Sequence, residues 1–244
     1  MTAHDAAPGA AQPLGTAPLC SVSDAVAARR SIRAYTDQPV DPALLRQVLD
    51  RAQRAASGGN VQPWQVTVMT GAPLAQLCAE VTGRAMAGDR GEPEFTIYPD
   101  PLPEPWKTQR AAVAYEMYAA MGIARDDRAG RAAAMLANFS AFGAPVLLFV
   151  HCRRLMGAAQ WADMGIWFGT LLLLLREAGL DSCPQEAWTN YGASVRRAIA
   201  LGDDDIVWTG LAIGHGVADA PVNNFAVPRL PIDQVVQWHG FDPA

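Results

Sequence analysis

The stretch AQWADMGIWFGTLLLLLREA, residues 159–178, decides the fold because it predicts one long helix that is apolar almost all round. Gly179, which follows it, is a suitable residue to end the helix. The bulky apolar side chains are Trp161, Ile166, Trp167, Phe168 and the run Leu171–Leu175. A helix of this kind must be buried on every side. We therefore expect it in the core of the domain and at a subunit interface.

Three short segments have the composition of strands. Residues 64–69 alternate between apolar and polar side chains, which indicates a half-buried strand. Residues 145–150 are apolar almost throughout and fit a strand buried on both faces, and residues 206–213 complete the core. We expect more helices than can pack against one face of so small a sheet. The sequence therefore predicts the α+β class.

The rest of the chain is mostly helical in pattern. A first helix is expected to begin at Ser23-Asp24 and to end in an arginine cluster. A second has Asp41 as N-cap and Pro42 in its first turn, and is expected to stop at Ser57. Further helices are expected at residues 73–86, 107–121, 125–142 and 191–200.

The chain is expected to form one domain, residues 21–244, that follows an N-terminal tail. Residues 1–20 are rich in small residues and are expected to form a disordered N-terminal tail. Residues 88–106 contain five prolines and little periodicity, which favours a lid or a mobile insert. Residues 217–244 carry few helical signals and are expected to form a C-terminal extension that wraps another surface.

Charge and composition exclude several classes of function. A net charge of −5 over 244 residues argues against broad nucleic-acid binding. The four cysteines stand far apart and no histidine lies at ligand spacing, so we expect neither a disulfide framework nor a metal site. The apolar run Met164–Leu175 is shorter than a bilayer span, and the first residues lack the positive start of a secretory signal. We therefore expect a cytoplasmic protein with no membrane partner.

The segment Arg29-Arg30-Ser31-Ile32-Arg33 lies where the first helix gives way to a loop. Its three guanidiniums and one hydroxyl form a compact set of donors that suits a phosphate dianion. By itself, the segment is also compatible with an exposed arginine cluster, which is the commoner case.

The segment Ser57-Gly58-Gly59-Asn60-Val61-Gln62-Pro63-Trp64 connects a helix to a strand. Paired glycines allow a ligand to approach the backbone closely. The amides of Asn60 and Gln62 each offer a donor and an acceptor, which suits a heterocycle with alternating C=O and N–H groups. By itself, the segment is also compatible with an ordinary helix-to-strand turn.

Together the two segments resemble the FMN-dependent nitroreductase family. The markers are R-R-S-I-R-x-Y from Arg29 to Tyr35 and S-G-x-N-x-Q-P-W from Ser57 to Trp64. The match continues through Leu180–Gln185, Pro228–Pro231 and Trp238–Phe241, so the resemblance spans residues 22–241 in the family's order. Residues 121–127 and 135–139 are similar to the nitrobenzoate-reductase-like branch.

The resemblance implies a three-layer α/β/α fold with a central, mostly antiparallel sheet, and an intertwined homodimer with two FMN sites. Arg33 would lie near the pyrimidine edge of the flavin, Arg229 would hold the phosphate, and a backbone N–H near Glu186 would point at N5. The full set that would contact FMN is Arg29, Arg30, Ser31, Arg33, Pro184, Gln185, Glu186 and Arg229 from one subunit, with Ser57, Asn60 and Gln62 from the other.

The resemblance also implies the reaction. NAD(P)H and a small, planar, electron-poor acceptor, a nitroaromatic or a quinone, would take turns over one flavin face in a ping-pong cycle. The flavin N5 would carry the hydride, so no side chain needs to act as a nucleophile. Gly214-His215-Gly216 lacks the third glycine of a dinucleotide-binding fingerprint, which agrees with the absence of a separate nicotinamide domain.

Two alternatives remain open. The first is a flavoenzyme of the same fold with another reaction, such as a flavin destructase, a reductive dehalogenase or an azoline oxidase. Glu94 and Tyr98 are similar to the lid of iodotyrosine deiodinases, although no lysine follows at the matching distance. Tyr98 and Trp106 are also candidates to stack on an acceptor. The second alternative is a non-enzymatic flavin carrier.

Overall fold

A single antiparallel sheet forms the centre of the computed structural model, which describes residues 21–240. The sheet has the order β1-β2-β4-β3 and consists of β1 (Gln65–Thr70), β2 (Val146–Arg153), β3 (Asp181–Gln185) and β4 (Asp205–Gly214). The α+β class and the antiparallel sheet are therefore confirmed. The tail expected at residues 1–20 and Phe241 of the closing motif lie outside the described residues.

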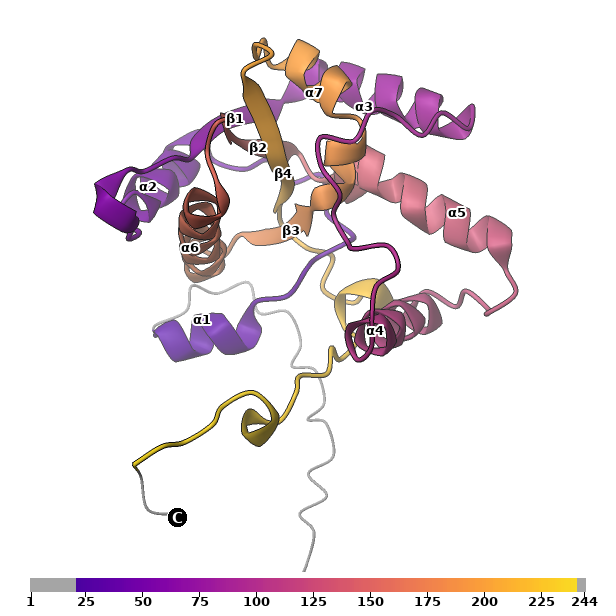
Figure 1. Ribbon diagram of the computed structural model, residues 1–244. Helices are drawn as coiled ribbons and strands as arrows, with labels where there is room; N and C mark the ends of the chain where they lie inside the picture. The colour runs from indigo at the N-terminus through magenta and orange to yellow at the C-terminus, as the bar shows by residue number, and fades with distance from the viewer. Residues whose placement is uncertain (1–20, 241–244) are drawn as a thin grey trace, which may run out of the picture.

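Helices cover both faces of this sheet (Figure 1). Side chains alternate between the two faces along a strand. In β2, Leu148 and Val150 belong to one hydrophobic core, and Leu147 and Phe149 belong to the other. The first core contains α2 (Pro42–Ala52) and α6 (Ala158–Glu177), and the second contains α3 (Gly71–Met86), α5 (Arg128–Leu136) and α7 (Gly192–Ala198). The three-layer arrangement is thus confirmed.

The starts of the first two helices show which polar residues cap them. Asp41 caps α2 as expected, since its Oδ1 accepts the Ala43 N–H at 2.8 Å. The cap of α1 (Val22–Ala28) is Ser21 rather than Ser23, and its Oγ accepts the Asp24 N–H at 3.1 Å. The expectation that the second helix continues to Ser57 is wrong, because α2 ends at Ala52.

One further expectation is corrected, and one strand that the sequence did not predict is present. The helix expected at residues 125–142 is divided into α5 and a 3-10 segment, Ala137–Gly143. The break occurs where Ala141 and Phe142 adopt left-handed backbone angles, with φ of 51° and 55°, next to the buried Phe139. Phe139 packs edge-on against Trp188 and Tyr191. Residues 181–185, which have no strand pattern, form the strand β3 by pairing with β4.

Helix α6 is buried on one side only within the single chain. Trp167 and Leu171 are fully buried against the sheet, whereas Ile166 keeps 49% of its surface exposed. Apart from the neighbouring backbone of α6 itself, no atom of residues 21–240 lies within 4 Å of the position a Cβ would take at Gly165 or Gly169. The expectation of burial on every side is therefore not met by one chain, which leaves an open face on α6.

The length of α6 also corrects an expectation about membranes. The 20-residue helix is long and apolar enough to cross a bilayer by length and composition, although the apolar run within it looked too short. The core helix of a soluble protein passes the same test. Here the buried side of α6 packs against α2 and the sheet, which accounts for its apolar composition.

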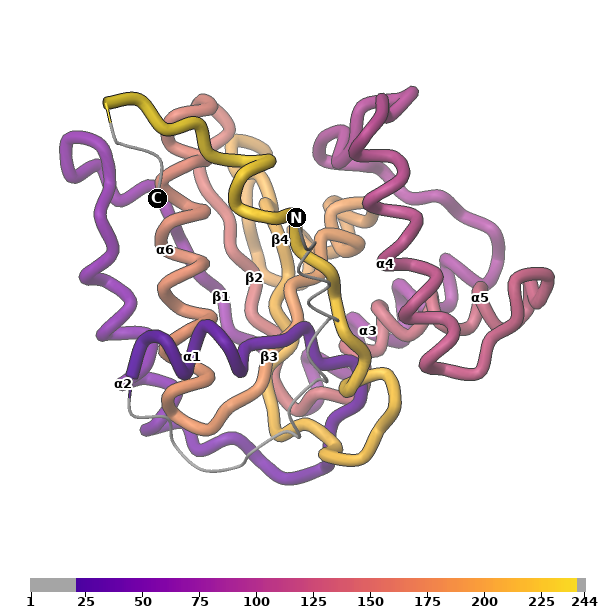
Figure 2. Tube along the Cα trace, turned by 90° about the horizontal axis from the view of Figure 1, so that it is seen from below, coloured from indigo at the N-terminus to yellow at the C-terminus, as the bar shows by residue number. Residues whose placement is uncertain are grey.

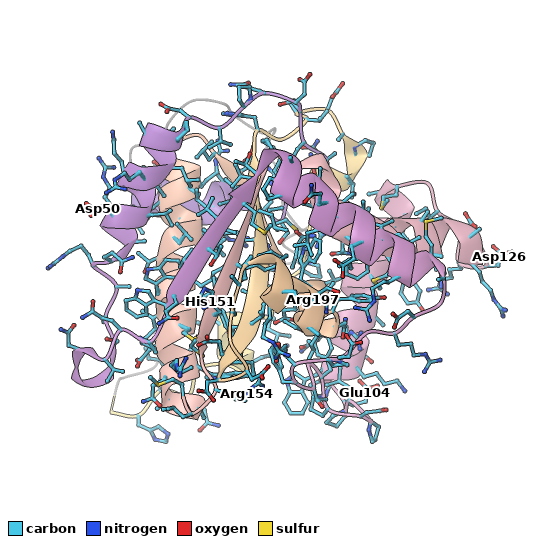
Figure 3. All side chains as sticks on the ribbon, turned by 90° about the horizontal axis from the view of Figure 1, so that it is seen from above. Asp50, Glu104, Asp126, His151, Arg154 and Arg197 are labelled. Atoms are coloured by element: carbon cyan, nitrogen blue, oxygen red, sulfur yellow. The ribbon has the colours of Figure 1, made fainter. Side chains whose placement is uncertain are left out.

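The buried His151 in β2 makes stability depend on pH (Figure 3). Its Nε2 lies 3.1 Å from Thr67 Oγ1, and its Nδ1 has no partner among residues 21–240. Burial lowers the pKa of His151, against a smaller opposing effect of Asp205. The unfolded chain then binds more protons, so stability is fully present above the ordinary histidine pKa of about 6.5 and falls as the pH decreases through the lowered value.

We predict that the free energy of unfolding of the wild-type protein falls between about pH 7.5 and pH 5.5 more steeply than that of a His151→Asn variant. Urea denaturation at several pH values measures both slopes. Equal slopes for the two proteins would show that His151 does not carry this dependence.

Candidate functional site

The arginine segment extends the sheet beyond β3. Ser31 forms a parallel bridge with Ser182, and the Ile32 N–H donates to the Ser182 carbonyl at 3.0 Å. Ile32 is buried, and successive side chains in an extended segment point to opposite sides. Ser31 and Arg33 therefore lie on the side that faces away from the core, next to the strand that leads into residues 184–186.

Asn223 locks this segment to the C-terminal part of the chain. It belongs to the 3-10 turn Pro221–Asn223 and is only 2% exposed. Its Oδ1 accepts the N–H groups of Arg33 at 2.7 Å and Ala34 at 3.2 Å. Its Nδ2 donates to the carbonyls of Ala34 at 2.8 Å and Val217 at 3.0 Å. No local motif in the sequence points to Asn223, because the segment that it contacts lies about 190 residues earlier in the chain.

Arg29 and Arg229 are brought close together although they stand at opposite ends of the chain. Burial lowers the pKa of the Arg29 guanidinium, and the positive charge of Arg229 lowers it further. Arg229 Nη1 donates only to the carbonyls of its own neighbours Val227 and Pro228. Within residues 21–240, no carboxylate forms an ion pair with Arg29, Arg33 or Arg229. Like charges gathered in this way, without a counter-ion, fit a small dianion such as phosphate.

Arg30 points to a different set of groups. Its Nη1 donates to the Asn223 carbonyl and to Asn224 Oδ1, each at 3.3 Å. Burial lowers its pKa, with a further contribution from the nearby Arg176. Its guanidinium therefore helps to attach the arginine segment to the C-terminal part of the chain.

The end of β3 lies beside the arginines and presents mainly backbone. The Gln185 side chain is buried, where its Nε2 donates to the Asn138 carbonyl at 2.7 Å and its Oε1 accepts the Trp188 Nε1–H at 3.3 Å. Gln185 can therefore reach a ligand only through its backbone. Burial raises the pKa of Cys183 to about 11, which keeps this thiol protonated and unreactive. Glu186 starts the 3-10 segment Glu186–Asn190, and desolvation raises the pKa of its carboxyl.

The loop of residues 57–62 presents its amides to the surface. The side chains of Asn60 and Gln62 are exposed, and Ser57 is half-buried. Their only side-chain bonds lie within the loop: Gln62 Nε2 donates to the Asn60 carbonyl, and Ser57 Oγ accepts the Gln62 N–H.

This loop and the arginines lie at opposite ends of α6. The Gly58 N–H donates to Asp163, near the start of the helix, whereas Arg30 lies near Arg176 at its end. The thirteen residue-to-residue steps from 163 to 176 span about 20 Å along a helix. The structure thus gathers Arg29, Arg33, Arg229 and the end of β3 in one place, and keeps Ser57, Asn60 and Gln62 apart from them. The segment after α1 and the C-terminal extension, which carry these arginines, run past each other (Figure 2).

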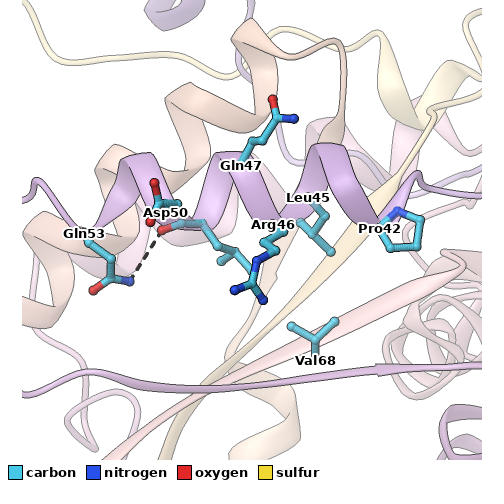
Figure 4. A pocket seen from close by; sticks show the side chains of 8 residues that line it. Pro42, Leu45, Arg46, Gln47, Asp50, Gln53 and Val68 are labelled. Carbon is cyan, nitrogen blue, oxygen red and sulfur yellow. Dashed lines mark hydrogen bonds between the residues drawn. The ribbon is translucent and has the colours of Figure 1, made fainter.

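One cavity lies at the other edge of the sheet. A groove of about 710 Å³ runs between α2 and β1, with Leu45, Leu49 and Val68 among its lining (Figure 4). Strand β1 is the opposite edge of the sheet from β3, about 14 Å away at the usual strand spacing. The groove therefore does not belong to the arginine site.

The insert of residues 88–106 is anchored at its start. The Glu94 carboxylate is buried between Arg154 at 2.9 Å and Arg196 at 2.7 Å, and the Glu94 N–H donates to the Thr189 carbonyl. A side chain at Gly192 would collide with Glu94. Because both its oxygens are engaged, Glu94 holds the insert in place and is not open to a substrate.

The far part of the insert is more exposed. It leads into α4 (Trp106–Ala120), none of whose residues is buried in the single chain. The Arg110 guanidinium lies over the Tyr98 ring, 4.2 Å from its centre. The helix expected at residues 107–121 is confirmed within one residue, and the insert itself is confirmed as irregular backbone.

Comparisons with known proteins agree on one family. A family model described as the Nitroreductase family matches residues 26–215. A 4-nitrobenzoate reductase of Pseudomonas putida is 31% identical over 217 residues, which cover 89% of this chain and 95% of that protein. A chloronitrobenzene nitroreductase of Comamonas testosteroni is 31% identical over 222 residues, which cover 87% of this chain and 94% of that protein.

Solved structures show the same similarity. The FMN- and NADPH-dependent nitroreductase NfnB of Sphigopyxis sp. strain HMH is 53% identical, with a TM-score of 0.89 over 91% of this chain and 100% of that one. The FMN-dependent NfnB of Mycobacterium smegmatis, solved in complex with NADPH, is 26% identical, with a TM-score of 0.85 over 89% of this chain and 98% of that one.

We predict that Asn223→Ala lowers the free energy of unfolding by about 2–3 kcal/mol, because the buried N–H groups of Arg33 and Ala34 lose their acceptor. Urea denaturation measures the loss. The matched control is Asn138→Ala, which removes a half-buried amide whose side-chain hydrogen bonds go only to Met135 among residues 21–240, and it should change stability by less than about 0.5 kcal/mol. Equal losses in the two variants would contradict the role given to Asn223.

Proposed function

The chain belongs to the nitroreductase family, and we propose that it is an NAD(P)H-dependent FMN oxidoreductase that reduces nitroaromatic compounds. The observation that carries this proposal is the convergence of Arg29 and Arg229 beside β3 without a counter-ion. The relatives support the reaction, since they are named for nitrobenzoate and chloronitrobenzene and for dependence on FMN and NADPH. Quinones share the planar, electron-poor character of these acceptors.

The residues gathered beside β3 fit FMN. Arg229 and Arg29 would hold the phosphate, Ser31 would contact the ribityl side, and Arg33 would approach the pyrimidine edge. Arg30 would support them from its contacts with Asn223 and Asn224. When bound, FMN supplies a ring that accepts hydride from NAD(P)H and passes it to the acceptor in a ping-pong cycle.

The protein's own groups set the environment of that ring. A fixed guanidinium charge stabilises negative charge that develops near it. Pro184 and the backbone of Gln185 and Glu186 would cover one face, with a backbone N–H directed at N5. The protonated Cys183 offers no competing nucleophile. The chain therefore binds, orients and tunes the cofactor rather than forming a covalent bond to substrate.

We also propose that the active form is a homodimer in the cytoplasm. The open face of α6 is lined by small and apolar residues: Ala162, Gly165, Ile166 and Gly169. Small side chains allow another helix to approach closely. The C-terminal extension adds exposed apolar residues that a second surface would cover: Leu230, Ile232 and Val235.

A twofold dimer also explains where the separated loop is used. In a twofold contact the same surface of each subunit meets its copy. If the two α6 helices pack antiparallel, the start of one helix lies near the end of the other. Ser57, Asn60 and Gln62 of one subunit would then reach the flavin held by the arginines of its partner.

The function is tested by spectroscopy and turnover on the purified protein. We expect a yellow, FMN-containing protein whose colour is bleached by NADPH or NADH without oxygen and restored by 4-nitrobenzoate, with steady consumption of the nicotinamide. Destruction of the flavin during turnover, or halide release from a halogenated phenol without nitro reduction, would favour another reaction on the same fold. Bound FMN that neither nicotinamide reduces would favour a flavin carrier.

A bulky residue on the open face of α6 should separate the subunits. A Cβ at Gly165 meets nothing within 4 Å among residues 21–240, and Gly165→Leu improves helix propensity by up to about 1 kcal/mol, so the single subunit should fold. We predict that it weakens the dimer and the apparent FMN affinity by about 10- to 100-fold, as overpacking does. Sedimentation and flavin titration measure both.

The matched control is Gly83→Leu on α3, where a Cβ also meets nothing within 4 Å. It should remain dimeric and bind FMN normally. A Gly165→Leu protein that is dimeric with unchanged FMN affinity would remove this face from the interface.

A further inference from the structure

Asp163 is a buried carboxylate with one partner. It is 8% exposed, and its Oδ1 accepts the Gly58 N–H at 3.0 Å. A Cβ at Gly58 would lie 3.8 Å from Oδ2, so both carboxylate oxygens face the loop of residues 57–62. No lysine, arginine or histidine within residues 21–240 forms an ion pair with it. Burying a charge without a cation is costly, so Asp163 is not explained by stability alone.

The loop that Asp163 holds has an unfavourable backbone. Gly59, Asn60 and Gln62 have φ values of 56°, 58° and 49°. Two of them are not glycine, and left-handed angles in such residues persist only where the surroundings impose them. Such angles also occur preferentially at ligand sites.

The bond to Asp163 is the main external restraint on this loop. The Asn60, Val61 and Gln62 N–H groups donate to Ser57 or Gly58 inside the loop. In the described part of the chain, the Gly58–Asp163 bond alone joins residues 57–62 to the rest of the protein by hydrogen bonding. A carboxylate is a stronger acceptor than a neutral group, which suits it to this task.

We propose that Asp163 is a positioning residue, which holds the loop of residues 57–62 in the shape that its amides need to contact the flavin of the partner subunit. This inference rests on the proposed function. Asp163 is itself buried, but its neighbour Ala162 and Ile166, one turn further on, are exposed on the open face of α6. It thereby connects the dimer contact to the loop that completes the partner's site.

The first test compares three variants as purified dimers. Asp163→Ala removes the acceptor and should weaken FMN binding by about 10- to 100-fold. Asp163→Asn keeps one acceptor oxygen in the same place and should restore affinity to within about threefold of wild type. Asp50→Ala on α2 is the control, because this exposed carboxylate has no contact with the loop.

The readouts separate positioning from a general structural role. Fluorescence titration gives the FMN dissociation constant, the visible circular dichroism of bound FMN reports its surroundings, and sedimentation confirms that each protein is a dimer. A dimeric Asp163→Ala protein with wild-type affinity and an unchanged flavin spectrum would overturn the inference. Loss of affinity in Asp163→Asn equal to that in Asp163→Ala would also contradict it.

A mixed dimer tests the direction of the effect. One subunit carries Asp163→Ala and the other carries Arg229→Ala, each with its own affinity tag. One site then has Arg229 from the Asp163→Ala subunit and the unaltered loop of the other subunit, so it is intact. The second site lacks Arg229 and also receives the loop of the Asp163→Ala subunit, so it carries both defects. We expect one FMN per heterodimer at a concentration at which neither homodimer is occupied. A heterodimer that binds no FMN would mean that Asp163 does not act on the partner's site.

One measurement needs no variant. The Gly58 amide of the wild-type apo-dimer should exchange its hydrogen slowly, because Asp163 accepts it, and rapid exchange would contradict the inference. The two proposals fail in different ways. Wild-type protein that does not bind FMN would contradict the proposed function, whereas wild-type binding that is insensitive to Asp163 would contradict only the positioning role.

Discussion

The organisation of this protein depends on one helix whose two sides both need to be covered. The buried side of α6 closes the core on the sheet through residues such as Trp167 and Leu171. Its other side, with Gly165 and Ile166, is not covered by any part of residues 21–240. Exposed apolar surface of this kind on a core helix is unfavourable in water. The same helix also separates the arginine site at one end from the amide loop at the other, so covering its open face with a second copy would complete both the core and the site.

The arginine site shows how a binding place can be assembled from weak local signals. Two guanidiniums that repel each other, Arg29 and Arg229, are held close by the surrounding structure. Asn223 makes this arrangement rigid, because its side-chain amide forms four hydrogen bonds. Three of them join it to Arg33 and Ala34 in the arginine segment, and the fourth joins it to Val217 in the C-terminal part of the chain. A bound anion would offset the repulsion between the two guanidiniums. Their closeness therefore favours the binding of a phosphate. The left-handed loop held by Asp163 follows the same principle, in that stable packing elsewhere maintains an unfavourable local arrangement.

Where sequence reasoning was wrong, distant contacts outweighed local pattern. Residues 181–185 contain Asp, Ser and Pro, which disfavour a strand, yet β3 forms because β4 offers a complete register of backbone partners. Pro184 has no backbone N–H to donate. It is tolerated because β3 is an edge strand, so few backbone N–H groups on its outer side need to pair with another strand. The expected helix at residues 125–142 contains no proline, and its one glycine, Gly130, lies in the first turn of α5 and away from the break. It breaks because Phe139 is required in the core beside Trp188, which no periodicity within the segment records.

The sequence alone determined the family, the α+β class, the long apolar helix with its end at Gly179, and the residue types that suit a flavin phosphate. These follow from local periodicity, from capping chemistry and from motifs whose order along the chain is characteristic. Only the tertiary structure decided that Arg29 meets Arg229, that the side chain of Gln185 turns inward, that Glu94 is an internal anchor, and that Asn223 and Asp163 hold the two motifs. The physical reason is that a hydrogen bond or a charge interaction depends on distance in space, and residues far apart in sequence carry no local sign of which partner they will meet.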